Sequence, residues 1–177
     1  EHKNNNFKTL GEKLFNLQIQ EQILEDGAHF ELSPMYHQII FEDILDIVNI
    51  YQVYEETIPE KWIDTAKAMQ KWARAMSHPD QGIAFFNDAA HKIASSLHDI
   101  ELYAANLGLK FPQDDFKIRN LEQSGYVIYN SEDVKLIFDC GQIGPDYIPG
   151  HGHADLFSIE LSIFGKRLIV NGGTSTY

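Results

Sequence analysis

The spacing of the hydrophobic residues changes from a helical period to a strand-like alternation near Gly108. Before that glycine, apolar residues recur every three or four positions, as on one face of an α-helix; after it, short segments alternate between apolar and polar residues. Helices followed by strands, without alternation of the two, are typical of an α+β chain with segregated layers or domains. We therefore predict a helical part over residues 1–108, a join over 109–123 and antiparallel β-structure over 124–177.

Four helices joined by short turns are expected in the first part, as stacked antiparallel hairpins. The second has the clearest start, because serine is a good helix N-cap and proline suits the first helical position, and Ser33-Pro34 supplies both. The first helix is expected to bury a stripe formed by Phe7, Leu10, Leu14 and Leu17, followed by Ile23 and Leu24. The expected helices cover about residues 7–26, 33–51, 59–78 and 88–106. His78, His91 and His98 are expected on helix surfaces or at caps.

The second part shows strand-like segments at about residues 125–129, 134–138, 156–164 and 168–170. In the third of them, Ile159 and its alternate neighbours lie on the same strand face as Asp155 and Phe157. We expect that face to be the core face, so that the residues before this strand emerge at the rim of the sheet.

Composition excludes some classes of partner. The formal charge of −12, from 26 acidic against 14 basic residues, disfavours a nucleic-acid partner, which needs a basic face. No apolar run is long enough to span a membrane, and one cysteine, Cys140, gives no internal disulfide. The chain opens at Glu1 and closes on a turn-like stretch, so we expect it to be a fragment.

The run Gly150-His151-Gly152-His153-Ala154-Asp155 is the strongest candidate for a site. In extended backbone, side chains two residues apart share a face, so both imidazoles and the carboxylate can converge on one metal ion or one sugar. The intervening glycine and alanine leave room for a ligand.

A second candidate is the loop at residues 26–37, before the second helix. Tyr36 falls in the first turn of that helix, where unpaired N–H groups and the helix dipole favour negative charge. His29, Glu31 and His37 are candidate substrate ligands beside it. The same residues are also compatible with an ordinary helix start and a structural loop, and position alone leaves both interpretations open.

Asn87 is a further candidate ligand, because it follows Phe85-Phe86 in a way that can present it into a cleft. A simple helix cap formed by Asn87-Asp88 is the alternative.

These motifs carry a resemblance to a known family. The segments DGAHFE (26–31), SPMYH (33–37), FDCG (138–141), GHGHAD (150–155) and VNGGTSTY (170–177) resemble the heparinase II/III family of polysaccharide lyases. The resemblance implies an incomplete α/α toroid followed by the start of an antiparallel β-sandwich, with the active site between them. It also implies a periplasmic or secreted protein.

The family cleaves acidic, uronate-containing polysaccharides or oligosaccharides by β-elimination. This reaction needs a group that neutralises the uronate carboxylate, a base for the C5 proton and an acid for the leaving oxygen. The resemblance implies that Tyr36 is the base, the acid or both, and that His151 faces the substrate and shares proton transfer. The Asn-His pair that neutralises the carboxylate is expected before Glu1.

The resemblance further implies a structural metal, usually zinc, held by His153 and Asp155 with a third ligand beyond Tyr177.

The chain departs from the family pattern in the loop at residues 26–37. Leu32 stands at a position that commonly carries arginine in the family, and this difference bears on the class of substrate. Two alternatives are a metal-dependent glycan hydrolase, which would use metal-bound water as the nucleophile, and a non-catalytic glycan-binding protein.

Overall fold

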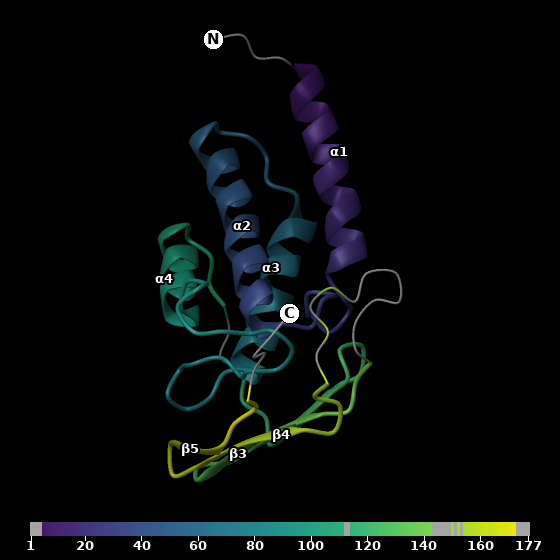
Figure 1. Cartoon of the computed structure of the whole chain (residues 1–177). Helices are drawn as coiled ribbons and strands as arrows, with labels where there is room; N and C mark the ends of the chain where they lie inside the picture. The colour runs from purple at the N-terminus through teal and green to yellow at the C-terminus, as the bar shows by residue number, and fades with distance from the viewer. Residues whose placement is uncertain (1–4, 112–113, 143–149, 151, 153, 173–177) are drawn as a thin grey trace.

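The computed structural model describes residues 5–111, 114–142, 150, 152 and 154–172, which form four helices and one five-stranded antiparallel sheet. The sheet lies across one end of the helical part (Figure 1). The helices are α1 (Asn5–Gln22), α2 (Pro34–Val53), α3 (Glu60–Ala75) and α4 (Leu97–Asn106). The strands are β1 (Ile118–Leu121), β2 (Tyr126–Asn130), β3 (Val134–Asp139), β4 (Ile159–Ile163) and β5 (Lys166–Ile169). Among these described residues, no helix combines the length and the apolar character that crossing a bilayer requires.

Helices α2 and α3 pack against each other and against α4, as their apolar period predicts. Their shared core is formed by Phe41, Ile44, Leu45, Ala66, Met69, Ala73, Leu97, Ile100 and Ala104. Helix α2 begins with Pro34 at its first position, and Ser33 occupies the N-cap. The Ser33 side chain makes no capping hydrogen bond, although its carbonyl accepts from the His37 N–H at 2.9 Å.

Most of the stripe expected for the first helix is wrong, because Phe7, Leu10, Leu14 and Leu17 are all exposed. Only its end is confirmed, since Ile23 and Leu24 pack against the core. The helix instead contacts its neighbours through a second apolar row that contains Phe15 and Ile19. The Phe15 ring meets Trp62 edge-on at a centroid distance of 4.9 Å, and the Trp62 indole N–H donates to Asn16 at 2.9 Å. A helical period allowed both rows, and only the tertiary contacts choose between them.

The fourth helix is shorter than predicted, because it begins at Leu97 rather than near Asp88. Asn87 and Lys92 have φ angles of +57° and +67°, which a right-handed helix does not contain. Residues 77–96 therefore form a long loop between α3 and α4.

The strands follow one another in the order β1-β2-β3-β4-β5, and every neighbouring pair is antiparallel. In the middle strand β3, Ile137 pairs with Ile128 of β2 on one side and with Glu160 of β4 on the other. Strands β2, β3, β4 and β5 lie within about three residues of the predicted strand segments. Strand β1 lies inside the predicted join at 109–123, so the sheet starts earlier than the alternation indicated.

One face of the sheet packs on the helical part. Tyr126, Ile128 and Ile137 from this face are fully buried. They join one hydrophobic cluster with residues of α3, of the loop between α1 and α2 and of the loop between α3 and α4: Ala28, Leu32, Trp72, Ala75, Met76, Ala84 and Phe86. This cluster fixes the sheet against the C-terminal end of α3.

The orientation predicted for β4 is wrong. Glu160 and Ser162 face the interior and are 0% and 1% exposed, whereas Ile159 and its alternate neighbours are half-buried on the outer face. The predicted alternation fails at Phe157, whose φ angle of +66° breaks the extended chain between Asp155 and the strand. Asp155 and Ile159 therefore do not share a continuous strand face.

Candidate active site

The loop that precedes α2 is held from several sides. Gly27 has a φ angle of +90°, and a Cβ atom there would collide with the carbonyl of Ala68 in α3, so only glycine fits. Asp26 accepts from both the N–H and the hydroxyl of Ser124, each at 2.8 Å. The hydroxyl of Ser124 in turn accepts from the indole N–H of Trp72 at 3.0 Å. The loop is therefore tied both to α3 and to the turn between β1 and β2.

His37 is fully buried at the start of α2, and both ring nitrogens bind backbone groups. Its Nδ1 accepts from the His29 N–H at 3.1 Å, so its Nε2 carries the hydrogen and donates to the Met69 carbonyl at 2.9 Å. Burial lowers the pKa of His37 from 6.5 to about 3, which the hydrogen bond to Met69 opposes and the proximity of His29 reinforces. The imidazole is therefore neutral and links the loop, α2 and α3.

His29 and Glu31 lie next to each other in the same loop. His29 is 3% exposed, and its Nδ1 lies 3.8 Å from a carboxylate oxygen of the half-buried Glu31. Its Nε2 lies 3.4 Å from the Gln22 side chain at the end of α1. The structure thus brings together three of the predicted loop residues, His29, Glu31 and His37.

Tyr36 lies in the first turn of α2 and is half-buried. Its ring packs against a small cluster formed by Met35, Ile83 and Ala89, the last two from the loop between α3 and α4. Because these contacts involve the ring, they orient the tyrosine without depending on its hydroxyl group.

Asn87 connects the two halves of the candidate site. Its backbone N–H donates to Asp155 Oδ2 at 2.6 Å, across 68 residues of sequence. Its side-chain Nδ2 donates to the Leu32 carbonyl at 3.0 Å, across 55 residues. The end of the GHGHAD run and the loop that leads into Tyr36 therefore meet on one residue.

Two contributors to this junction were not predicted. Tyr126 of β2 donates its hydroxyl to the Leu32 carbonyl at 3.2 Å, and burial raises the pKa of Tyr126 well above its ordinary value, so the donor stays protonated. Asn171 donates from Nδ2 to Asp155 Oδ2 at 3.3 Å. The alternation that identifies β2 as a strand does not show that its buried tyrosine reaches a loop carbonyl.

His78 is buried, which contradicts its expected place on a helix surface. Its Nε2 lies 2.6 Å from Glu160 Oε2 and its Nδ1 lies 2.7 Å from the Ser162 hydroxyl. The other Glu160 oxygen accepts from the backbone N–H groups of Phe85 at 2.8 Å and Asn171 at 2.9 Å. This network explains why β4 turns its polar residues inward.

Arg167 of β5 holds the same loop at a second point. Its guanidinium donates to both carboxylate oxygens of Asp80, at 2.8 and 3.0 Å, and to the Ile83 carbonyl at 2.8 Å. The hydrogen bonds from Arg167 lower the pKa of Asp80. Residues 78–87 are thus fixed to the sheet along most of their length.

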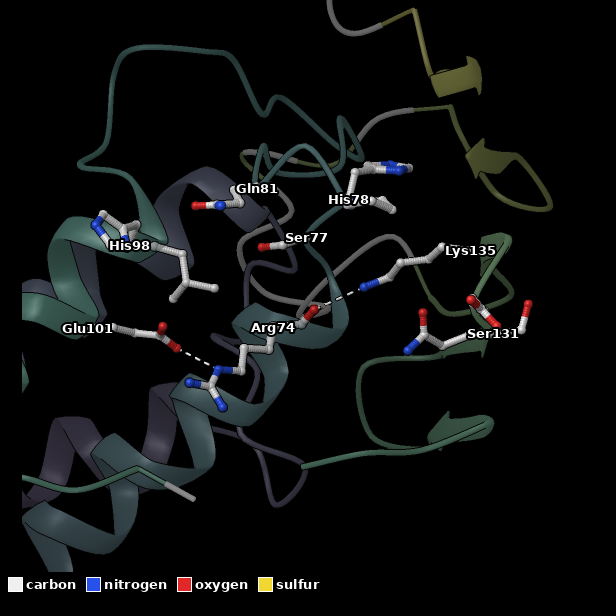
Figure 2. A pocket seen from close by; sticks show the side chains of 12 residues that line it. Arg74, Ser77, His78, Gln81, His98, Glu101, Ser131 and Lys135 are labelled. Carbon is white, nitrogen blue, oxygen red and sulfur yellow. Dashed lines mark hydrogen bonds and ion pairs between the residues drawn. The ribbon is translucent and has the colours of Figure 1, made fainter. Parts of the chain in front are cut away.

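A hollow of about 540 Å³ lies between the end of α3, the start of α4 and the hairpin of β2 and β3 (Figure 2). Figure 2 shows Lys135 reaching across it to donate to the Arg74 carbonyl at 3.0 Å, while the Arg74 side chain binds Glu101 at 2.6 Å. Burial lowers the pKa of Lys135 to about 8. Of the residues predicted for the active site, none that the structure describes lines this hollow.

Of the two predicted metal ligands, His153 lies outside the described residues, as does the predicted catalytic residue His151. Asp155 is 5% exposed, and its Oδ2 already accepts from Asn87 and Asn171. Within the described part of the chain, no three His, Cys, Asp or Glu side chains come together as a metal site requires. Among the described residues, Asp155 is therefore the one predicted ligand that can be assessed. No hydrogen bond from a described residue reaches its Oδ1 atom, which can thus bind a metal ion.

Comparisons with solved structures agree with the fold. The heparan sulfate lyase HepC from Pedobacter heparinus matches 98% of this chain and 30% of its own, with a TM-score of 0.77 and 19% identity. A heparinase III structure matches 90% of this chain and 30% of its own, with a TM-score of 0.74 and 17% identity.

Sequence comparisons point to the same group. A heparin-sulfate lyase from Bacteroides stercoris is 31% identical over 188 residues, which cover 94% of this chain and 27% of the relative. A heparin-sulfate lyase from Pedobacter heparinus is 24% identical and covers 97% of this chain and 28% of its own length. The chain thus spans little more than a quarter of the relatives it matches.

Two family models divide the chain at the transition between helices and sheet. The model described as heparinase II/III N-terminus matches residues 2–116, and the one described as heparinase II/III-like, C-terminal matches residues 114–177. Their boundary falls just before β1, where the described structure changes from helices to strands. The chain belongs to the heparinase II/III family.

Proposed function

We propose that this chain is part of a polysaccharide lyase that cleaves an acidic, uronic-acid-containing polysaccharide by β-elimination. The observation that carries the proposal is the junction at Asn87, which joins the loop before Tyr36 to the end of the GHGHAD run. The two segments that hold the candidate proton-transfer groups thus meet at one place. The matched relatives are heparin-sulfate lyases, which supports an acidic polysaccharide as substrate.

In this proposal Tyr36 transfers protons at the sugar, as base, acid or both. Its place in the first turn of α2 puts it at the positive end of the helix dipole, which favours a transient phenolate. His151 shares the proton transfer. A positioned acid or base typically contributes about 10²–10⁴-fold to the rate.

The other predicted residues have different roles. Glu31 can meet the sugar, because it is only half-buried. His29, which is buried, supports Glu31 from 3.8 Å. His37 acts through position, since it is fully buried and both its nitrogens bind the backbone. Asn87, predicted as a ligand, is 3% exposed and is treated below.

We also propose a structural zinc or other divalent cation near Asp155, with His153 as a second ligand. A carboxylate and an imidazole are suitable zinc ligands, and Asp155 is fixed by two donors. When bound, such an ion would stabilise the folded GHGHAD segment. We assign it no step in the reaction.

For the architecture, we propose that the helices are part of an α/α toroid and that the sheet is one layer of a β-sandwich. The exposed stripe of α1 and the half-buried apolar outer face of β4 support this, because both are surfaces that a further layer would cover. A periplasmic or secreted location follows from the proposed substrate.

The test uses the complete protein and a panel of uronate polysaccharides that includes heparan sulfate and alginate. β-Elimination leaves a C4–C5 double bond, so we expect an ultraviolet absorbance that rises in step with new reducing ends. New reducing ends without absorbance would identify a hydrolase, and sugar binding without either would identify a binding protein. Both outcomes would contradict the proposal.

A further inference from the structure

We propose that Asn87 is a positioning residue, which sets the place of the Tyr36 helix start relative to Asp155, the last residue of the GHGHAD run. This inference rests on the proposed lyase function, because it concerns the geometry of that site. It differs from the role of sugar ligand that the sequence suggested for Asn87.

Asn87 uses two separate groups to bind two separate segments. The backbone N–H binds Asp155 at 2.6 Å and the side-chain amide binds the Leu32 carbonyl at 3.0 Å. Its φ angle of +57° lies in the left-handed region, which asparagine tolerates better than most residues. In this conformation the backbone N–H and the side-chain amide of Asn87 point to different partners.

The Leu32 end of this link controls the entry into α2. Leu32 also has a positive φ angle, +60°, which is unfavourable for leucine and requires support from its surroundings. Its carbonyl supplies that support, because it accepts from both Asn87 and the Tyr126 hydroxyl. The next residue, Ser33, is the N-cap of α2, so fixing Leu32 fixes the first turn in which Tyr36 lies.

The Asp155 end controls the exit from the GHGHAD run. The Asp155 carboxylate accepts hydrogen bonds from Asn87 and Asn171. The backbone carbonyl of Asp155 accepts from the Ser158 N–H at 2.8 Å. The last residue of the GHGHAD run is therefore held on both its carboxylate and its backbone.

The loop that carries Asn87 is itself rigidly attached to the sheet. Two residues earlier, the Phe85 N–H binds the buried Glu160, and Arg167 binds the Ile83 carbonyl. The amide of Asn87 is also buried and directed to protein acceptors, among them the Leu32 carbonyl. A buried residue with fixed neighbours suits the task of holding reacting groups in place, where displacements of about 1 Å can cost 10²-fold in rate.

The first experiment is a double-mutant cycle on turnover in the complete protein. Asn87→Gly keeps a residue that accepts a positive φ and keeps the N–H to Asp155. It removes the side-chain bonds to the Leu32 carbonyl and to the Tyr126 hydroxyl. We expect kcat to fall about 10-fold or more while KM stays within about threefold, since the loss is of alignment. If Asn87 acts through Tyr36, adding Asn87→Gly to Tyr36→Phe will cost little further turnover.

The matched control is Gln81→Gly. Gln81 lies in the same loop with a φ angle of +65°, but it is exposed and has no bond to Leu32 or Asp155, so we expect unchanged kcat and KM. A rise in KM at constant kcat for Asn87→Gly would identify a sugar ligand instead. Fully additive losses in the cycle would show that Asn87 acts independently of Tyr36, and either result would overturn the proposal.

The second experiment does not depend on activity. Hydrogen exchange should become faster in Asn87→Gly over residues 28–37, because the variant removes the bond to the Leu32 carbonyl. Residues 154–158 should keep their exchange, because the backbone N–H to Asp155 remains. Unchanged exchange over residues 28–37, or faster exchange throughout the chain, would overturn the proposal. If the wild-type protein makes no unsaturated product, the lyase function fails, and the exchange result still decides whether the Asn87 side chain holds the loop before α2.

Discussion

The imidazole of His78 and the carboxylate of Glu160 lie 2.6 Å apart, across 82 residues of sequence, and neither side chain is exposed. The pair joins the loop after α3 to the centre of the sheet. Glu160 also accepts from two backbone N–H groups, so its loss would leave several buried donors without an acceptor.

We therefore expect Glu160→Ala to lower the free energy of unfolding by about 3–5 kcal/mol, as for removal of one partner of a buried pair. Urea unfolding followed by circular dichroism measures this. Glu132→Ala, at an exposed site on the β2–β3 turn, should change the same quantity by less than about 0.5 kcal/mol. Equal effects of the two substitutions would contradict the structural role of the pair.

Tyr36→Phe tests the proton-transfer role directly. The ring keeps its packing against Met35, Ile83 and Ala89, so we expect thermal stability to stay nearly unchanged. Turnover should fall by about 10²-fold or more, the low end of what an acid–base group supplies. The release of unsaturated product measures it, and a wild-type rate in this variant would mean that Tyr36 is only a packing residue.

His37 predicts a pH dependence of stability. Its pKa is lowered from 6.5 to about 3 in the folded protein, so between these values the unfolded chain binds the extra proton and acid favours unfolding. This group should lower the free energy of unfolding by up to about 1.4 kcal/mol for each pH unit below 6.5.

The comparison is with His37→Gln, which does not titrate. Unfolding in urea at several pH values between 4 and 7 should give a shallower slope for the variant than for the wild type. If the two slopes coincide, His37 binds its proton equally in the folded and unfolded states.

Leu32 tests the departure from the arginine that commonly stands at this position in the family. Its side chain is 5% exposed within the cluster that joins α3 to the sheet, so Leu32→Arg forces a longer, charged group into packed surroundings. We expect a loss of about 1–3 kcal/mol in unfolding free energy, whereas Leu32→Met should cost less than about 1.5. Thermal and urea unfolding of both variants check this, and an arginine variant as stable as the wild type would refute it.

Metal content tests the proposed ligands. In the complete protein we expect a bound divalent ion that is lost in His153→Ala, and elemental analysis of the purified proteins measures it. The control is His98→Ala, an exposed histidine at the start of α4. A stoichiometry unchanged by His153→Ala would remove His153 from the metal role.

The elements that could be predicted are those that local patterns determine. The start of α2 follows from Ser33-Pro34, and the order of helices then strands follows from the change of period. The loop at 88–96 could not be predicted, because the left-handed turn at Asn87 is supported by Asp155, which lies far away in the sequence.

The same reason explains the errors in the sheet and the site. Alternation shows that β4 has two faces, but the inward face is chosen by His78, which binds Glu160 and Ser162. The motifs identified the two segments of the site. They did not show that Asn87 lies between these segments as a buried connector.

The attachments of the loop at residues 77–96 have a consequence for the order of folding. His78, Asp80, Phe85 and Asn87 all find their partners in residues 155–167, so these bonds close long stretches of chain. Contacts between residues distant in sequence form slowly, because the entropy of loop closure is lost before the contacts repay it. We therefore expect helices α2 and α3 to form before these bonds, so that the candidate catalytic centre is completed late in folding.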